Sequence, residues 1–117
     1  MDLSIESNDK GVVRVKVKGQ IVQTALNMPP EPLGQLLGDG AYGHKVVMNL
    51  GEATFIDSSG LGWLLMCHRR FRDAAGRFIL HSMPPMVSDV VKVMRLDQVL
   101  KIVEDEGSAL SAVGAEA

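Results

Sequence analysis

The sequence predicts an α/β fold with a mostly parallel central sheet of about four or five strands, about four packing helices and an antiparallel N-terminal strand. Over residues 13–18, valines alternate with lysines and an arginine, which is the period of a strand with one buried face. Compact apolar runs at 45–50 and 77–81 are separated by segments of helical periodicity. Because buried strands that alternate with crossover helices form parallel sheets, these patterns together predict the fold class.

The N-terminal third predicts a β-hairpin followed by a short helix. Leu3 and Ile5 are expected to form the antiparallel partner of the alternating strand, with the turn at residues 8–11. A cluster of prolines over 29–32 then precedes leucines at helical spacing, so a short helix is predicted to end at residues 38–40.

The centre of the chain predicts a compact strand over 45–50, a loop, and then residues 54–56 leading into a long helix. This helix is expected to run to about residue 75 and to stop at Gly76. The face predicted to contact the sheet follows the i, i+3, i+4, i+7 rule and consists of Leu61, Leu64, Leu65, His68, Phe71 and Ala75.

Another side of this helix carries Trp63, Met66 and Arg70. Tryptophan, methionine and arginine are enriched in protein interfaces, so these residues predict a docking surface. The alternative is that Trp63 packs in the core against a neighbouring helix, or lies under the proline-rich loop. The sequence leaves both interpretations open.

The C-terminal third predicts two more strand-helix pairs. Residues 77–81 form a buried strand, and the next helix begins at two prolines with an apolar stripe of Met86, Val90, Val93 and Met94. A short strand over 100–103 follows, Ser108 caps a terminal helix, and residues 114–117 are expected to be a frayed tail.

Composition excludes several function classes. The 117 residues fit one domain, 1–117, and the net charge of −2 comes with no basic stripe, which disfavours a nucleic-acid partner. Cys67 is the only cysteine, and the three histidines lack metal-ligand spacing, so neither a metal site nor a cofactor is expected. There is no signal-peptide pattern and no apolar run long enough to span a bilayer, so a cytoplasmic protein without membrane insertion is predicted.

The residues Asp57, Ser58, Ser59 and Gly60 stand where an apolar strand turns into the long helix. A helix N-terminus has backbone N–H groups without partners and a partial positive charge, so it holds capping oxygens or phosphate. A serine at this position is therefore either a cap or a phosphorylation switch. The run lacks the glycine spacing of a nucleophile elbow, which argues against an enzyme.

The run DSSGLGWLL, after VVMNLGEATFI, resembles the signature of the STAS family, the fold of bacterial anti-sigma factor antagonists. In antagonists that resemble this chain, the serine directly after the aspartate is phosphorylated, which implies that Ser58 is the phosphorylated residue. Asp57 is then assigned to local positioning, and Ser59 and Gly60 to capping and turn geometry.

The resemblance also implies a regulatory cycle with three kinds of protein. The unmodified antagonist binds an anti-sigma factor that is a serine kinase with a histidine-kinase-like ATPase domain, and this binding releases a sigma factor. Phosphorylation ends the binding, and a metal-dependent serine phosphatase restores it. Physically, a phosphate adds a charge of about −1.5 to −2 to an otherwise apolar and neutral interface.

The sequence departs from antagonists in one segment next to the signature. Where they commonly carry Gly, Glu, Leu or Ile, and Asp, this chain has Gly19, Gln20, Ile21 and Val22. Gln20 remains a candidate for partner binding because its amide still forms hydrogen bonds.

Two alternative functions follow from these observations. The missing acids suggest a STAS adaptor that works without phosphorylation, for example a subunit of an ABC-type lipid transporter or of another signalling complex. The helix N-terminus alone suggests binding of a nucleotide or small anion, although no glycine-rich phosphate loop accompanies it.

Overall fold

The computed structural model describes residues 1–22 and 31–114, and in these it confirms the predicted fold class. Five strands and four α-helices alternate as predicted along these residues, with two short 3-10 turns between them. The strands are β1 (Asp2–Asp9), β2 (Val12–Ile21), β3 (Lys45–Ile56), β4 (Arg77–His81) and β5 (Ile102–Val103). The helices are α1 (Pro32–Leu37), α2 (Ser58–Asp73), α3 (Pro85–Val93) and α4 (Glu106–Val113), and the 3-10 turns are η1 (Ala41–Gly43) and η2 (Leu96–Gln98).

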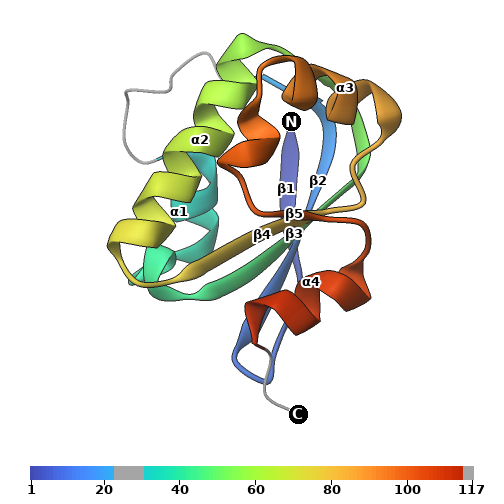
Figure 1. Cartoon of the computed structure of the whole chain (residues 1–117). Coiled ribbons are helices and arrows are strands. Elements are labelled where there is room, and N and C mark those ends of the chain that lie inside the picture. The colour runs from blue at the N-terminus through green and yellow to red at the C-terminus, as the bar shows by residue number, and fades with distance from the viewer. Residues whose placement is uncertain (23–30, 115–117) are drawn as a thin grey trace.

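The five strands form one sheet in the order β1-β2-β3-β4-β5 (Figure 1). β1 pairs with β2 in antiparallel fashion, as the hairpin pattern predicts, and the other three pairings are parallel. In the parallel part, β2, β3 and β4 run in the same direction, so α2 and α3 both follow the carboxyl end of a strand, although β3 continues seven residues beyond Asn49, the partner of the last residue of β4.

Two separate hydrophobic clusters hold the helices on the sheet. One cluster joins the alternating valines of β2 to the buried sides of α1, α2 and α3, while the other joins Val12, Val47 and Ile79 to Ala109 and Val113 of α4. Since successive side chains of a strand point to opposite faces, α1–α3 cover one face and α4 covers part of the other. Burial of each large apolar side chain contributes roughly 1.5–3 kcal/mol.

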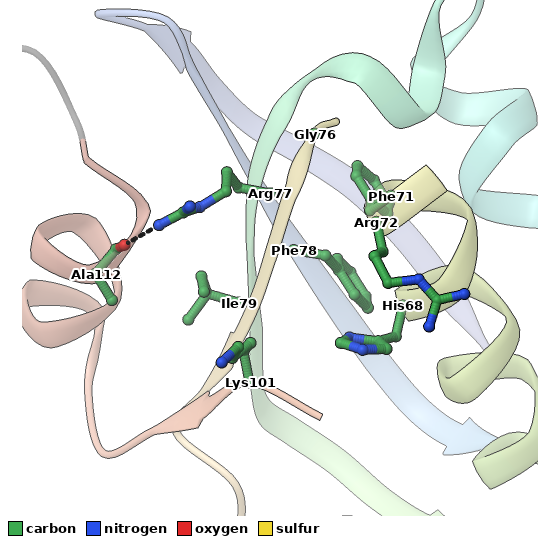
Figure 2. A pocket seen from close by; sticks show the side chains of 9 residues that line it. All are labelled: His68, Phe71, Arg72, Gly76, Arg77, Phe78, Ile79, Lys101 and Ala112. Carbon is green, nitrogen blue, oxygen red and sulfur yellow. Dashed lines mark hydrogen bonds between the residues drawn. The ribbon is translucent and has the colours of Figure 1, made fainter. Parts of the chain in front are cut away.

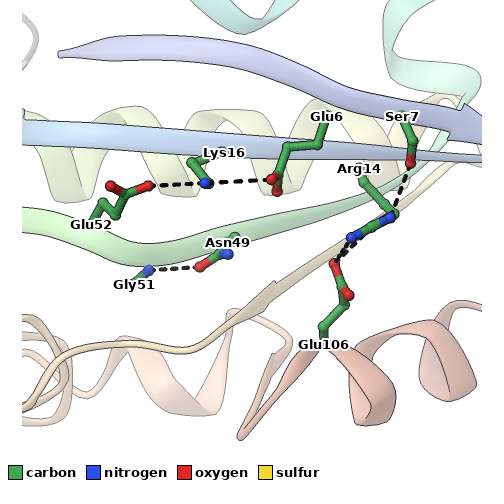
Figure 3. A network of polar contacts seen from close by, with 8 residues as sticks. All are labelled: Glu6, Ser7, Arg14, Lys16, Asn49, Gly51, Glu52 and Glu106. Carbon is green, nitrogen blue, oxygen red and sulfur yellow. Dashed lines mark hydrogen bonds and ion pairs between the residues drawn. The ribbon is translucent and has the colours of Figure 1, made fainter.

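The part of the second face that α4 leaves uncovered is polar. Lys16 lies between two carboxylates, with its Nζ 2.9 Å from Glu52 Oε2 and 3.4 Å from Glu6 Oε2 (Figure 3). Arg14 is 2.7 Å from Glu106 at the start of α4 and so ties this helix to β2. Because these groups are partly exposed, water and salt screen their charges, and each pair adds little to stability. Their main consequence is a hydrophilic surface on this side.

Strand β3 is longer than predicted. The loop expected after Leu50 is absent, since the strand continues to Ile56 and pairs with β2 through two register shifts. The Asn49 side chain accepts a hydrogen bond of 2.7 Å from the backbone N–H of Gly51, which accommodates the irregularity locally. The stretch after Leu50 is polar and contains a glycine, which is typical of a loop, but it forms the hydrogen bonds of a strand.

The predicted buried faces of two helices are each rotated in the structure. In α2, Trp63 and Cys67 are fully buried beside Leu64 and Phe71, while His68 is only half-buried and Ala75 is exposed outside the helix. Helix α2 packs against η1 as well as the sheet, so it buries a second side. In α3, the buried residues are Val87 and Val91, whereas Met86, Val93 and Met94 of the predicted stripe are exposed.

The ends of the last helix also differ from the prediction. Asp105, rather than Ser108, caps α4, because its Oδ1 accepts a hydrogen bond of 2.8 Å from the Ser108 N–H. Gly114 was assigned to a frayed tail but ends the helix in a left-handed conformation with φ 74°, and its carbonyl accepts a hydrogen bond from Lys45. The rest of that predicted tail, 115–117, and the prolines at 29 and 30 lie outside the described residues.

Candidate functional site at the start of α2

Ser58 is the first residue of α2 and is exposed. Within the described parts of the chain, no group hydrogen-bonds its hydroxyl, so Ser58 is not a cap. The hydroxyl therefore stands at the positive end of a helix of 16 residues and is accessible to another protein. This is the geometry that a modification of Ser58 requires.

Asp57 is the N-cap of α2. Its Oδ1 accepts hydrogen bonds from the Gly60 N–H at 3.0 Å and from the Ser59 hydroxyl at 2.6 Å. These two hydrogen bonds, the Ser59 hydroxyl first, lower the pKa of the Asp57 carboxyl below its ordinary value, so it is ionised at neutral pH. The assignment of capping to Ser59 is corrected accordingly, since Ser59 donates to the capping carboxylate.

Gly60 has a packing role in place of the predicted turn role. A Cβ atom built on Gly60 would lie 1.9 Å from the carbonyl oxygen of Ile21, at the end of β2. Its φ is not in the left-handed region, so conformational freedom is not the reason for glycine here. The first turn of α2 needs glycine because the backbone of β2 passes directly against it.

Gln20 lies next to the Ser58 junction on the neighbouring strand. The register pairs Gln20 with Phe55 and Ile21 with Ile56, so β2 and β3 end together beside Asp57. Gly19, with φ 83°, adopts a backbone conformation that favours glycine and marks the register shift just before Gln20. Both Gln20 and Phe55 are exposed, which the strand pattern did not indicate for Phe55.

Trp63 does not form the exposed docking surface that the sequence suggested. Its side chain has no exposed area, and its Nε1 donates a hydrogen bond of 3.0 Å to Glu31, a carboxylate that is itself buried. Glu31 also accepts hydrogen bonds from two backbone N–H groups at the start of α1 and from the Tyr42 hydroxyl. Burial, and then the hydrogen bond to Glu31, raises the pKa of Tyr42 to about 12. The core alternative for Trp63 is therefore the one the structure shows.

Met66 and Arg70 are also separated from the Ser58 junction. Met66 is half-buried against the core. Arg70 is exposed, but its Nη1 donates a hydrogen bond of 3.1 Å to the Tyr42 hydroxyl and its guanidinium lies over the Tyr42 ring. Along a helix rising about 1.5 Å per residue, Arg70 lies roughly 18 Å from Ser58. The three predicted docking residues therefore do not form one surface with the serine.

The structure instead places exposed apolar residues on α3 and directly after it, and α3 packs against β3. Met86, Val93 and Met94, which we call the α3 apolar surface, are 53%, 79% and 56% exposed. Phe55, 41% exposed, precedes Ser58 by three residues on β3. Two prolines in the sequence correctly predict where α3 begins. The predicted buried stripe of α3 is wrong, because Met86, Val93 and Met94 are exposed.

The described residues contain no group of three or more histidine, cysteine or acidic side chains arranged to hold a metal ion. Nor does any helix in 1–22 and 31–114 have the length and apolar character to cross a membrane. Cys67 is buried, and burial raises the pKa of its thiol, which keeps it protonated.

Residues 8–109 match the model of the STAS domain family. The chain belongs to the STAS family. A relative named anti-sigma F factor antagonist, from Paenibacillus polymyxa, is 25% identical over 112 residues, which are 95% of each chain. STAS antagonists of this type are regulatory proteins, and the prediction of a non-enzymatic domain is confirmed at this level.

Solved structures of anti-sigma factor antagonists share the STAS fold. One from Mycobacterium paratuberculosis has a TM-score of 0.75 and 23% identity, covering 97% of this chain and 95% of its own. Unphosphorylated SpoIIAA has a TM-score of 0.74 and 23% identity, covering 99% of both chains. SpoIIAA of Bacillus in its phosphorylated form has a TM-score of 0.66 and 23% identity, covering 96% of this chain and 99% of its own.

Proposed function

We propose that this STAS domain is an anti-sigma factor antagonist that acts in the cytoplasm and is switched by phosphorylation of Ser58. In its unmodified form it binds an anti-sigma factor with serine kinase activity, and a sigma factor is released. The observation that carries the proposal is the position of Ser58: an exposed hydroxyl without a partner in the described chain, at a helix start that another residue already caps.

The electrostatics of the junction support such a switch. Before modification, the carboxylate next to Ser58 is that of Asp57, which accepts hydrogen bonds from Ser59 and Gly60. A phosphate would add a charge of about −1.5 to −2 beside it. The first turn of α2 would stabilise part of this charge, so the fold is kept, while a partner seated there would have to bury the rest.

The same arrangement suggests where the partner docks. The end of β3 supplies Phe55 and the end of β2 supplies Gln20, both beside the Ser58 junction, and α3, which packs against β3, supplies its apolar surface. An apolar centre with a polar rim is the usual composition of a protein interface. The proposed docking site therefore includes the α3 apolar surface. The buried Trp63 is not part of it, and neither are Met66 and Arg70.

The test is a phosphorylation assay with the kinase captured from the native cell. Incubation with this kinase and ATP should label Ser58, and the label should be removed by a metal-dependent serine phosphatase. Ser58→Ala should abolish labelling, while Ser59→Ala should retain it, because Ser59 bonds inward to Asp57. Ser58→Asp should weaken the complex about tenfold. Labelling that persists in Ser58→Ala would refute the assignment.

A second candidate is an adaptor that works without phosphorylation, as a subunit of an ABC-type lipid transporter or of another signalling complex. It is favoured by one observation: residues 20 and 22, beside the junction, are glutamine and valine in place of acids. Capture from the native cell separates the two. Recovery of a transporter ATPase without a kinase would support the adaptor, and recovery of a kinase with a sigma factor would support the switch.

A further inference from the structure

His81, the last residue of β4, is a histidine buried on the side of the sheet where α4 packs. It is 1% exposed. It lies on the same face as Ile79, two residues earlier, whose side chain belongs to the hydrophobic cluster shared with α4. Figure 2 shows the two sides of β4, because Arg77 and Ile79 extend toward α4 and Phe78 extends toward α2. A titratable side chain is therefore buried on the layer that α4 covers.

Two hydrogen bonds connect the end of β4 to the chain that enters α4. His81 Nδ1 and Ser82 Oγ are 2.8 Å apart and share a hydrogen bond. Ser82 has φ 61°, a left-handed conformation that is uncommon for serine, and its N–H donates to the Glu104 carbonyl at 3.2 Å. Glu104 is followed directly by Asp105, the N-cap of α4. The start of α4 is therefore tied to the residue next to the buried histidine.

Helix α4 is attached to the sheet differently at its two ends. At the C-terminal end, Lys45 Nζ donates a hydrogen bond of 3.1 Å to the Gly114 carbonyl, and Arg77 donates one of 3.0 Å to the Ala112 carbonyl (Figure 2). At the N-terminal end, Glu106 forms a partly exposed ion pair of 2.7 Å with Arg14 of β2 (Figure 3). Screening by water weakens such a pair. A change of charge beneath the first turn therefore acts on the end of α4 that an exposed ion pair holds.

The charged groups that face His81 come from the elements packed around it. They are Glu6 of β1, Arg14 and Lys16 of β2, and Asp105 and Glu106 of α4, while β3 and β5 place the uncharged Asn49 and Val103 beside it. Burial, the largest cause, and the charge of Arg14 lower the pKa of His81 below its ordinary value of 6.5, although the nearby carboxylates oppose this shift. The ring is therefore neutral in the folded chain at pH above 6.5, and the folded state disfavours its protonation.

We propose that His81 is a pH-sensitive latch for α4: the neutral imidazole lets the N-terminal end of α4 pack on the sheet, and proton uptake opens that end. A buried imidazolium would lie beside the Arg14 guanidinium and the positive end of the α4 dipole, which disfavours the packed state. Opening exposes the ring to water, where it accepts a proton at its ordinary pKa.

The sign of the pH dependence follows from the lowered pKa of His81. The stabilisation of the packed helix is complete above the ordinary value of 6.5 and is lost as the pH falls through the folded value. Helix α4 covers the opposite face of the sheet from α2, so the latch does not depend on the phosphorylation of Ser58. It gives the domain a second form of regulation.

The test compares hydrogen exchange of the full chain at about pH 7.5 and about pH 5.5, a range in which histidine titrates and carboxylates ordinarily stay charged. The reporter is the Ala109 amide, which donates to the Asp105 carbonyl at 3.0 Å in the first turn of α4. After correction for intrinsic exchange, its opening should rise at least about threefold in acid, while opening of α2 amides changes less than about twofold. His81→Gln should abolish the rise, whereas His68→Gln, a matched change of a half-buried histidine on α2, should retain it.

Two charge variants give an independent test that keeps His81 in place. Glu106→Gln and Arg14→Gln break the same ion pair, so both should increase opening of α4 at either pH. They act oppositely on proton uptake, because Glu106 raises the pKa of His81 and Arg14 lowers it. NMR of the His81 ring should show a fall in its pKa of about half a pH unit in Glu106→Gln and an equal rise in Arg14→Gln. The acid-induced increase in opening should be larger in the first variant and smaller in the second.

Three results would overturn the proposal. The first is an Ala109 opening that does not rise in acid, and the second is a rise that persists in His81→Gln. The third is an equal acid-induced rise in α2, which would mean that the whole domain opens. If His81→Gln does not fold, shifts of the His81 pKa in the same direction in the two charge variants would also overturn it.

Discussion

The two ends of α2 carry opposite chemistry. At the N-terminal end, the carboxylate of Asp57 satisfies the helix start and leaves the Ser58 hydroxyl exposed beside apolar residues. At the C-terminal end, Arg70 and Arg72 lie in the last turn, and Arg72 lines a pocket together with His68, Lys101 and apolar residues. Both placements complement the helix dipole, which is positive at the N-terminus and negative at the C-terminus.

The two ends differ in the side chains that are not needed to stabilise the helix. At the start of α2, Asp57 caps the helix, and the uncommitted group is the neutral hydroxyl of Ser58, which a phosphate can convert into an anion. At the other end, the cations exceed what the helix end requires, and Lys101 adds to them from another element. One end is therefore suited to acquiring a negative charge, while the other already carries an excess of positive charge.

The largest expected effect is structural and concerns only the N-terminal end. Gly60→Ala would place a Cβ 1.9 Å from the Ile21 carbonyl oxygen, so β2 and α2 must move apart. We expect a loss of about 3 kcal/mol or more in the free energy of unfolding, measured by urea denaturation. In a Ser58 labelling assay at a temperature where the variant is folded, labelling should also fall, because the first turn of α2 is displaced.

Gly107→Ala is the matched control for this substitution. Gly107 lies in α4, and the nearest atom to a Cβ there is 3.6 Å away, an ordinary contact. Alanine in a helix is favoured over glycine by about 1 kcal/mol, so this variant should be as stable as the parent or slightly more so. Equal losses in the two variants would contradict the close approach of β2 to α2.

The two ends also differ in how far the sequence could predict them. The Ser58 junction is local: an aspartate, two serines and a glycine between a strand and a helix are adjacent in the chain, and their placement follows from the helix start. The pocket at the C-terminal end of α2 is assembled from residues of α2, β4, α4 and the approach to β5. Its residues have no shared spacing, so only the sheet topology brings them together.

The predicted fold was confirmed for the order of elements but not for every buried face. The periods of 2 and 3.6 located the strands and helices, because burial of one face dictates the pattern. Trp63 was ambiguous because its burial depends on Glu31, 32 residues earlier in sequence, which satisfies the indole N–H. A buried carboxylate that pairs with a distant tryptophan leaves no periodic signal.

The next effect concerns the docking surface beside Ser58. Val93 is 79% exposed, so Val93→Asp should change stability by no more than about 0.5 kcal/mol. If the partner buries the α3 apolar surface, a charge at its centre should weaken the complex about tenfold, measured by calorimetry with the captured partner. Such a loss would extend the N-terminal site from α2 to α3.

Ile5→Asp provides the control, because Ile5 is a 42% exposed apolar residue on β1, at the opposite edge of the sheet from β5. It should not affect partner binding. Arg70→Ala should change the affinity less than twofold, given its distance of roughly 18 Å from Ser58 along α2. An unchanged affinity for Val93→Asp would remove α3 from the docking site.

The smallest expected effect separates the two roles of the Asp57 carboxylate, capping and charge. Asparagine caps helices as well as aspartate, so Asp57→Asn keeps the cap but loses the charge. The pKa of Asp57 is lowered in the folded chain, chiefly by the Ser59 hydroxyl, so its stabilisation is present above its ordinary pKa of 3.8 and is lost as the pH falls through the folded value. Urea denaturation at pH 7 and pH 3 should therefore show a stability difference between parent and variant that shrinks in acid.

Asp105→Asn makes the same change at the start of α4, where Asp105 is also the N-cap and hydrogen bonds from Ser108 lower its pKa. The two variants should therefore have the same direction of pH-dependent stability. Only Asp57→Asn should alter the rate of Ser58 phosphorylation, since only its carboxylate lies beside the reacting hydroxyl. If both variants changed that rate equally, Asp57 would act on Ser58 only through fold stability, and the negative charge at this end of α2 would have no specific part in the switch.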